Sequence, residues 1–371
     1  MMNESNYREL TDFNQAKTVQ YVPVICVVFI TCLTGTVSNI FAIRYFNAKK
    51  NKSTDYFLLL TLSVINLLSC LYMFSIIGVL VHTATFTSDL ECKIFSFLSH
   101  FFLSSSYFTV FDVSVFRFNK VYLRSTSTRM CAKLSVVCIF IIALFVSLPE
   151  WVSSGVSEFA LSKHTDTKGK QCTTEDSADM RLLSKYVRIT KGAIVVIISV
   201  ALVVMYSLIV HKVKSSTGKL RSGSHVGTAT SNIEMIPEQA SNIQPVRSVT
   251  RSTNTASLTA ITDSEHEQVG LSIRNQYRKR ITPCAVNKRL RRRISRMAFM
   301  LSLTSILSLI PYLCISVSTT MSKHEYPAWM VFLYNSAIFF PCLTPFICGY
   351  CNTEFRNSVY KSVCRYTFWG K

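Results

Sequence analysis

The chain has 371 residues, of which 49% are hydrophobic and only 16% charged, and its mean hydropathy is +0.30. This composition argues against a soluble protein. The formal net charge of +20 invites a nucleic-acid interpretation, but the positive residues concentrate in alternate connections between apolar stretches, as they do in membrane proteins. Anionic lipid headgroups or an acidic partner therefore explain the charge better than DNA, and no nucleic-acid partner is expected.

Seven apolar stretches approach the roughly 20 residues that an α-helix needs to cross a bilayer. They cover residues 21–43, 56–81, 94–115, 134–152, 192–210, 297–317 and 329–351. Together with the charge distribution, they predict an all-α bundle of seven transmembrane helices over residues 21–351. The expected location is the plasma membrane, with the N-terminus outside and the C-terminus in the cytosol.

The polar residues 1–20 are expected to form an extracellular N-terminus without a cleavable signal peptide, and Asn3 in Asn3-Glu4-Ser5 fits a glycosylation site. From about 215 to 276 the sequence is rich in Ser, Thr, Asn and Gln and has no aromatic residue, which predicts a disordered cytoplasmic linker. Arg291 and Arg292 belong to a basic cluster directly before the sixth stretch. That cluster predicts a cationic helical extension, or simply a positive-inside stop signal.

Residues 352–371 form the predicted cytoplasmic tail. Phe355, Val359 and Val363 recur at a helical period among basic residues, which predicts a short amphipathic eighth helix lying on the membrane surface. Cys364 in the same segment is either S-palmitoylated or an inert cytosolic thiol.

The thirteen cysteines become informative once they are sorted by compartment. All but Cys92 and Cys172 fall in predicted spans or on the predicted cytosolic side, where thiols stay reduced. The oxidising exterior therefore allows one intrachain disulfide, between the start of the third helix and the connection after the fourth. Two free thiols are the alternative.

Several residues inside the spans favour a functional role. Asn39, Asn66 and Ser106 lie near mid-membrane and predict a polar layer, although ordinary adhesion between helices explains them equally well. Pro311 and Pro345 each remove a helical hydrogen bond and predict kinks that are either hinges or static bends.

In this order and spacing, the features resemble the rhodopsin-like (class A) family of G-protein-coupled receptors. They include the disulfide at the head of the third helix, Arg117 at its other end, the helix prolines and the amphipathic tail helix. The resemblance implies that Arg117 meets a heterotrimeric G protein when the sixth helix moves outward, and that Tyr206 steadies it. It also implies coupling roles for Arg291 and Arg292, and places Asn39, Asn66, Ser106 and Thr344 in a polar core.

The chain departs from the family pattern around Arg117. Phe116 stands where the family has an acid beside the arginine, and Arg291 occupies the region where some members supply a second carboxylate. Without an acidic partner for Arg117, the inactive state loses an ion pair. The sequence therefore predicts raised basal signalling.

The expected ligand cavity is moderately polar, uncharged and aromatic, which suits a peptide end or a small neutral ligand. Its candidate lining residues are Ser99, His100, Leu103, Tyr312, Ser316 and Tyr334. By the same resemblance, Ser99 replaces the aspartate of amine receptors and Ile338 the lysine of opsins. An amine or retinal ligand is therefore not expected.

Other functional classes find less support. The sequence contains no catalytic motif, and no cofactor or metal site is expected. Asp112 is expected to be the only acid within a span. Repeat symmetry and charged pathway residues, which are typical of transporters, are not evident. The remaining alternative is a receptor-shaped protein that binds a ligand or partners without coupling to G proteins.

Overall fold

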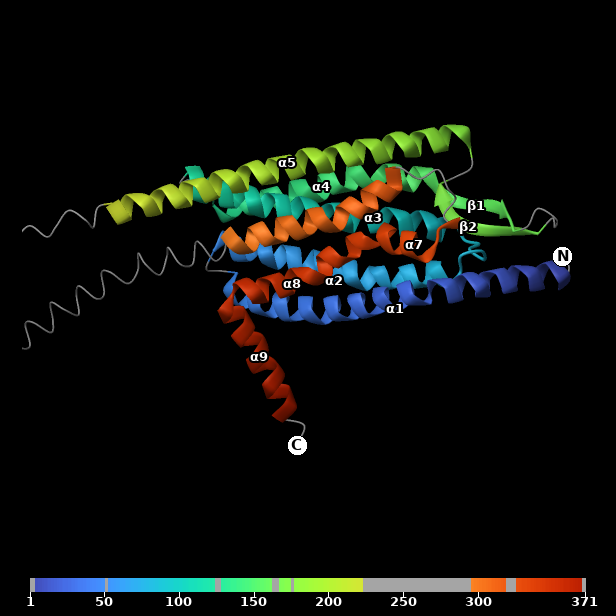
Figure 1. Ribbon diagram of the computed structural model, residues 1–371, viewed down its shortest axis with the longest axis horizontal. Helices are drawn as coiled ribbons and strands as arrows, with labels where there is room; N and C mark the ends of the chain where they lie inside the picture. The colour runs from blue at the N-terminus through green and yellow to red at the C-terminus, as the bar shows by residue number, and fades with distance from the viewer. Residues whose placement is uncertain are drawn as a thin grey trace, which may run out of the picture. The chain divides into compact units, whose positions relative to one another are not determined.

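The computed structural model describes residues 4–50, 53–123, 128–161, 167–174, 177–222, 295–317 and 325–368 (Figure 1). Residues 1–212 and 292–371 form one compact unit, and 213–291 form a second. Three predicted sites, Asn3, Arg291 and Arg292, lie outside the described residues, as does the predicted linker beyond residue 222.

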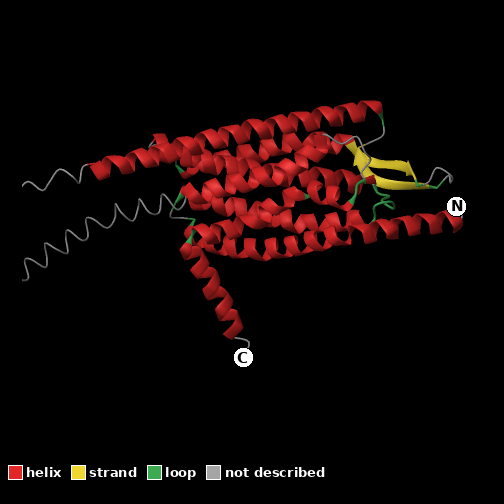
Figure 2. Ribbon diagram, viewed as in Figure 1, coloured by secondary structure: helices red, strands yellow, loops and turns green. Residues whose placement is uncertain are grey.

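The described chain is almost entirely helical (Figure 2). Its long helices are α1 (Glu4–Lys49), α2 (Thr54–Val81), α3 (Asp89–Phe118), α4 (Arg129–Ser153), α5 (Ala178–Ser222) and an unlabelled helix at Ser295–Val317. Shorter elements are the π-helical turn η1 (Asn119–Leu123), α7 (Ala328–Tyr334), the 3-10 turn η3 (Ser336–Ile338), α8 (Phe339–Cys351) and α9 (Thr353–Phe368). The strands β1 (Ser154–Ala160) and β2 (Lys168–Thr174) form one antiparallel hairpin.

Among the described residues, six helices are long and apolar enough to cross a membrane. A seventh span is present if α7 and the helical segment Ser336–Cys351, which are bent against each other, count as one. The predicted seven-helix bundle is therefore confirmed. The hairpin and the start of α1 lie at one end, which we call the hairpin end; the C-terminal end of α3 lies at the other, the arginine end (Figure 1).

The helix α1 is longer than its apolar stretch because residues before that stretch contact other parts of the protein. The Asn14 side chain donates to the Val81 carbonyl (2.7 Å) and accepts from the Ala84 amide (3.1 Å). The Phe13 ring lies 5.9 Å from that of Phe159 on the hairpin. These contacts let the helix begin at Glu4, so the predicted N-terminal segment is an extension of α1.

The last span is bent by 45° around Asn335, where α7 gives way to η3 and α8. Pro345 lies inside α8, and the kink expected there stays a prediction. The Asn335 backbone leaves the helical region (φ −90°, ψ 7°), while its side chain donates to the Val331 carbonyl (2.8 Å). The Ser336 hydroxyl donates to the Ser308 carbonyl (2.8 Å), which fixes the bend in this span against the helix Ser295–Val317.

Close packing in the middle of the bundle depends on Gly35 in α1. A Cβ atom there would lie 2.5 Å from the Cys342 sulfur and 2.7 Å from the Cys70 sulfur. Only glycine therefore lets α1, α2 and α8 approach this closely.

The predicted tail helix is confirmed as α9, but its apolar face is only partly available to a membrane. Phe355 is buried, and its ring stacks on that of Phe46 at 5.9 Å. Val359 packs against the same core. The start of α9 is thus anchored to α1 by aromatic contacts, and its position on a membrane surface stays a prediction.

Candidate functional site

The structure brings part of the predicted polar core together. Ser106 on α3 donates a hydrogen bond to the Asn66 carbonyl oxygen on α2 (2.6 Å). Asn39 on α1 donates to the carbonyl of Pro341 on α8 (3.1 Å). Thr344 instead donates to Phe340 on its own helix (2.9 Å). The amide groups therefore join α1 to α8 and α2 to α3, whereas the threonine contact joins no two helices.

At the arginine end, Arg117 forms an ion pair that the sequence did not predict. Its Nη2 lies 2.8 Å from Oδ2 of Asp55, and the Lys120 amine lies 2.9 Å from the same oxygen. The side chains of Arg117 and Asp55 are only 2% and 6% exposed, whereas that of Lys120 is 47% exposed. We refer to these three residues as the inner cluster.

Local sequence positions Asp55 for this contact. Ser53 is the N-cap of α2: its hydroxyl accepts from the Asp55 amide (3.3 Å) and donates to the Asp55 carboxylate (3.0 Å). Removing a partner from a buried ion pair is costly because the remaining charge is left in a low-dielectric interior. Asp55 thus replaces the acid missing beside Arg117, and the premise that this arginine lacks an acidic partner was wrong. Raised basal signalling, which was inferred from that premise, stays a prediction.

Tyr206 belongs to a hydrogen-bonded network with two serines. Its hydroxyl lies 2.8 Å from the Ser114 hydroxyl, which lies 3.1 Å from that of Ser302. These three buried residues come from α3, α5 and the Ser295–Val317 helix. The network therefore ties the helix that carries Arg117 to the helix predicted to move.

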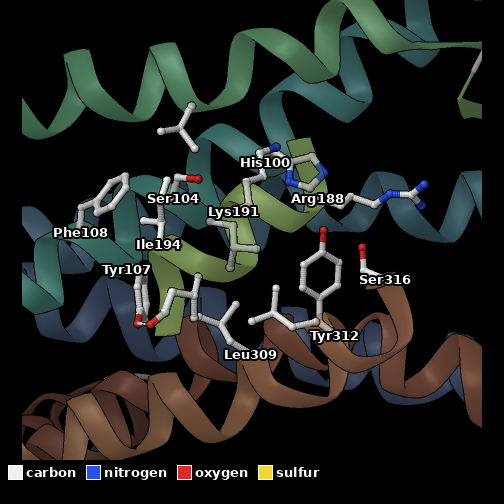
Figure 3. A pocket seen from close by; sticks show the side chains of 14 residues that line it. His100, Ser104, Tyr107, Phe108, Arg188, Lys191, Ile194, Leu309, Tyr312 and Ser316 are labelled. Atoms are coloured by element: carbon white, nitrogen blue, oxygen red, sulfur yellow. Dashed lines mark hydrogen bonds between the residues drawn. The ribbon is translucent and has the colours of Figure 1, made fainter. Parts of the chain in front are cut away.

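At the hairpin end, the bundle contains a cavity whose inner part is shown in Figure 3. All the predicted ligand candidates line its outer part: Ser99, His100, Leu103, Tyr312, Ser316 and Tyr334. The inner part extends to Tyr107, Phe108 and Leu309.

The cavity is charged, contrary to the uncharged site that we expected. The Lys191 amine lies 2.6 Å from Oε1 of Glu150, and Nε2 of His100 lies 3.6 Å from the same oxygen. Arg188 lines both parts of the cavity. We call Glu150, Lys191, His100 and Arg188 the outer cluster.

These charges were missed because they stand at the ends of apolar stretches. Glu150 lies directly after Pro149 inside the fourth apolar stretch, 134–152, and α4 continues through both residues to Ser153. Asp112 is therefore not the only acid within a span. Lys191 and Arg188 precede the fifth stretch, but α5 begins at Ala178 and carries them on its first turns.

A disulfide joins Cys92 in the first turn of α3 to Cys172 on β2, with a Cα–Cα distance of 5.4 Å. Cys172 also lines the outer part of the cavity. The hairpin is held in place beside this opening. On its exposed face, hydrogen bonding and charge from Lys168 lower the pKa of Glu158 below its ordinary value.

Two other predicted sites stay predictions. Cys364 is half-buried on α9, and nothing in the described structure bears on its palmitoylation. Pro311 lies within the helix Ser295–Val317, and its role as a hinge is not tested by its position.

A family model described as "7 transmembrane receptor (rhodopsin family)" matches residues 38–348, which is most of the chain. No curated protein matches the sequence. Members of this family are multi-pass membrane receptors and not enzymes, in agreement with the spanning helices described above. The chain therefore belongs to the rhodopsin family of seven-transmembrane receptors.

Proposed function

We propose that the protein is a G-protein-coupled receptor of the plasma membrane, which binds an extracellular ligand and activates heterotrimeric G proteins. The observation that carries this proposal is the buried Asp55–Arg117 pair at the opposite end of the bundle from the cavity. A ligand and a transducer would then occupy opposite ends. The ligand is neither an amine nor retinal, and a peptide is favoured.

In the proposed mechanism, the helix Ser295–Val317 moves outward and exposes the arginine. Ser302 on that helix is hydrogen-bonded to Ser114, which is hydrogen-bonded in turn to Tyr206, so movement of the helix would break this network. The Nε donor of Arg117 has no hydrogen-bond partner within the described chain. This donor is therefore available to an acceptor that enters from the arginine end.

The decisive test is Arg117→Ala in cells that express a set of chimeric G proteins. We expect basal and peptide-stimulated responses to fall by at least ~10-fold, because the side chain that meets the G protein is gone. Arg129→Ala is the matched control, since Arg129 is an exposed arginine at the start of the next helix. It should signal like the unmodified receptor.

Loss of Arg117 also leaves the Asp55 carboxylate without its buried partner, which could impair folding. Asp55→Asn/Arg117→Ala removes both charges, and surface labelling reports the amount of folded receptor. If this double variant reaches the surface but gives no response, coupling depends on the arginine. Wild-type responses from Arg117→Ala would show coupling that does not depend on the arginine and would contradict the proposed role of Arg117. No response from any receptor would instead favour a receptor-like protein that does not couple.

The proposed orientation places the N-terminus outside the cell and the basic segments in the cytosol, where anionic lipids and the G protein lie. An N-terminal epitope tag should be labelled on intact cells, and a C-terminal tag only after permeabilisation. Labelling of both tags on the same side would contradict this orientation and the seven-span topology together.

A further inference from the structure

The outer cluster contains more positive charge than its one acid can neutralise. Lys191 pairs with Glu150 at 2.6 Å, and both side chains are mostly buried, at 15% and 13% exposure. Arg188 lies three residues earlier on the same helix, so it shares a face of α5 with Lys191. Glu150 is thus matched by Lys191, and Arg188 supplies an additional charge in the cavity wall.

Arg188 has no acidic partner within the described residues. Its Nε donates to the Ser184 carbonyl of its own helix (3.3 Å), and no carboxylate lies within ion-pair distance of the guanidinium. In Figure 3 the Arg188 guanidinium lies beyond His100 and Tyr312, on the side of the cavity where Ser316 lies and opposite to Phe108 and Leu309. The two terminal nitrogens of the Arg188 guanidinium are therefore left to bind a planar anion.

The groups around this guanidinium suit an anion. The hydroxyls of Tyr312 and Ser316 point into the same end of the cavity from the helix Ser295–Val317 (Figure 3). Guanidinium and hydroxyl donors together can satisfy both oxygens of a carboxylate. An organic cation would find the Glu150 carboxylate already paired with Lys191 and would face the positive charge of Arg188.

The other end of the cavity is apolar. Tyr107 and Leu309 are buried there and pack with Leu103, Phe108 and Val195. The Tyr107 hydroxyl is already hydrogen-bonded to the Val195 carbonyl (3.1 Å), so its ring is what faces the cavity. This end can accept an aliphatic or aromatic group but offers no second charge.

We propose that the cavity binds a ligand with a carboxylate at Arg188 and an apolar or aromatic group against Tyr107, Phe108 and Leu309. The inference rests on the proposed receptor function, because it assigns the ligand chemistry of the same cavity. Two sources share this chemistry: the free C-terminus of a peptide whose last side chain is apolar, and a small monocarboxylic acid. Of the two ligands expected from the sequence, the peptide end fits this proposal and the small neutral molecule does not.

The test uses the full-length receptor in lipid nanodiscs, with binding measured as thermal stabilisation in the absence of a G protein. The probes are short peptides with apolar C-terminal residues and a set of aromatic and aliphatic monocarboxylic acids, each with its matched primary amide. We expect at least one acid to bind at least ~10-fold more tightly than its amide, as an ionic hydrogen bond to a guanidinium provides. The peptide and small-acid arms identify the source.

Arg188→Gln should reduce this preference to within about threefold, because the neutral side chain cannot pair with the anion. Arg188→Lys should retain part of it, since the charge remains but the bidentate fork is lost. Lys185→Gln is the control: Lys185 is exposed, lies one turn earlier on α5 and should leave the preference unchanged. A cooperative thermal unfolding transition in buffer without ligand shows that each variant is folded.

The inference is overturned if no acid binds more tightly than its amide, or if the preference persists in folded Arg188→Gln. Its outcome is separable from that of the coupling proposal. Acids that stabilise the receptor without eliciting any G-protein response would support the inference and contradict coupling. Equal Arg117-dependent signalling from acids and amides would support coupling and contradict the inference.

Discussion

The inner and outer clusters contain the same arrangement of formal charges, and they differ in where the excess cation lies. In each, one carboxylate is accompanied by two basic side chains from Lys and Arg. At the arginine end both cations converge on one oxygen of Asp55, and the half-exposed Lys120 places the excess charge in solvent. At the hairpin end Lys191 neutralises Glu150, and the excess charge of Arg188 lies in a cavity wall.

This difference separates an ion pair that holds helices together from one that prepares a binding site. Water can stabilise the surplus charge of the inner cluster, so that cluster needs no further partner. The surplus charge of the outer cluster is partly removed from water and is best compensated by an anion that enters the cavity. Net charge alone would not distinguish the two.

The largest effect is expected for Asp55→Asn, which leaves the Arg117 guanidinium buried without its acid. The free energy of unfolding should fall by about 3–5 kcal/mol, and basal signalling should rise because the inactive arrangement loses the pair. Thermal unfolding of purified receptor and a ligand-free second-messenger assay measure the two effects. Unchanged stability and basal signalling would show that the pair does not hold the inactive state.

Glu354→Gln is the matched control for this change. Glu354 lies 2.6 Å from Lys49, but its side chain is 60% exposed. Loss of an exposed ion pair should cost less than ~1 kcal/mol. A comparable loss in both variants would mean that burial does not determine the strength of these pairs.

A smaller effect is expected for Glu150→Gln, which leaves Lys191 without its acid and adds a second unmatched cation to the cavity wall. Stability should fall by about 1–3 kcal/mol, because the partner charge is partly buried. Acidic probes should bind several-fold more tightly, in the opposite direction to the effect of Arg188→Gln. Competition binding with an acid and its amide checks the sign, and weaker acid binding would contradict the comparison.

The smallest effect is expected for Lys120→Ala. Because Lys120 is about half exposed, its removal should lower the free energy of unfolding by less than ~1 kcal/mol and leave basal signalling near that of the unmodified receptor. The measurements are those used for Asp55→Asn. An effect as large as that of Asp55→Asn would make Lys120, and not Arg117, the essential partner of the carboxylate.

Much of the fold was predictable because spanning a membrane is a constraint on local sequence. Each helix must cover the hydrocarbon with apolar residues and satisfy its backbone internally, so run length and composition identify it. The errors occur where this constraint ends. Residues 4–20 are polar and helical because Asn14 and Phe13 find partners in other elements. The bend at Asn335 depends on an inserted side-chain hydrogen bond, which no hydropathy pattern records.

The candidate site was predictable in its positions but not in its electrostatics. The six predicted cavity residues meet because helix periodicity and the order of the spans place them near one end. Arg188, Lys191 and Glu150 were missed because charged residues beside an apolar stretch are usually interfacial anchors. Arg188 and Lys191 enter the cavity because α5 begins well before its apolar stretch, and Glu150 does so because α4 continues through Pro149.

The sequence alone determined that the chain crosses a membrane as a helical bundle, which cysteines face the oxidising side in that topology, and where along α3 its arginine lies. Only the tertiary structure decided which acid faces that arginine and which cation is left over in the cavity. The physical reason is that hydropathy acts along one helix at a time, whereas the partner of a charge depends on how helices pack and rotate against one another. Asp55 and Arg117 meet only because the start of α2 lies beside the end of α3.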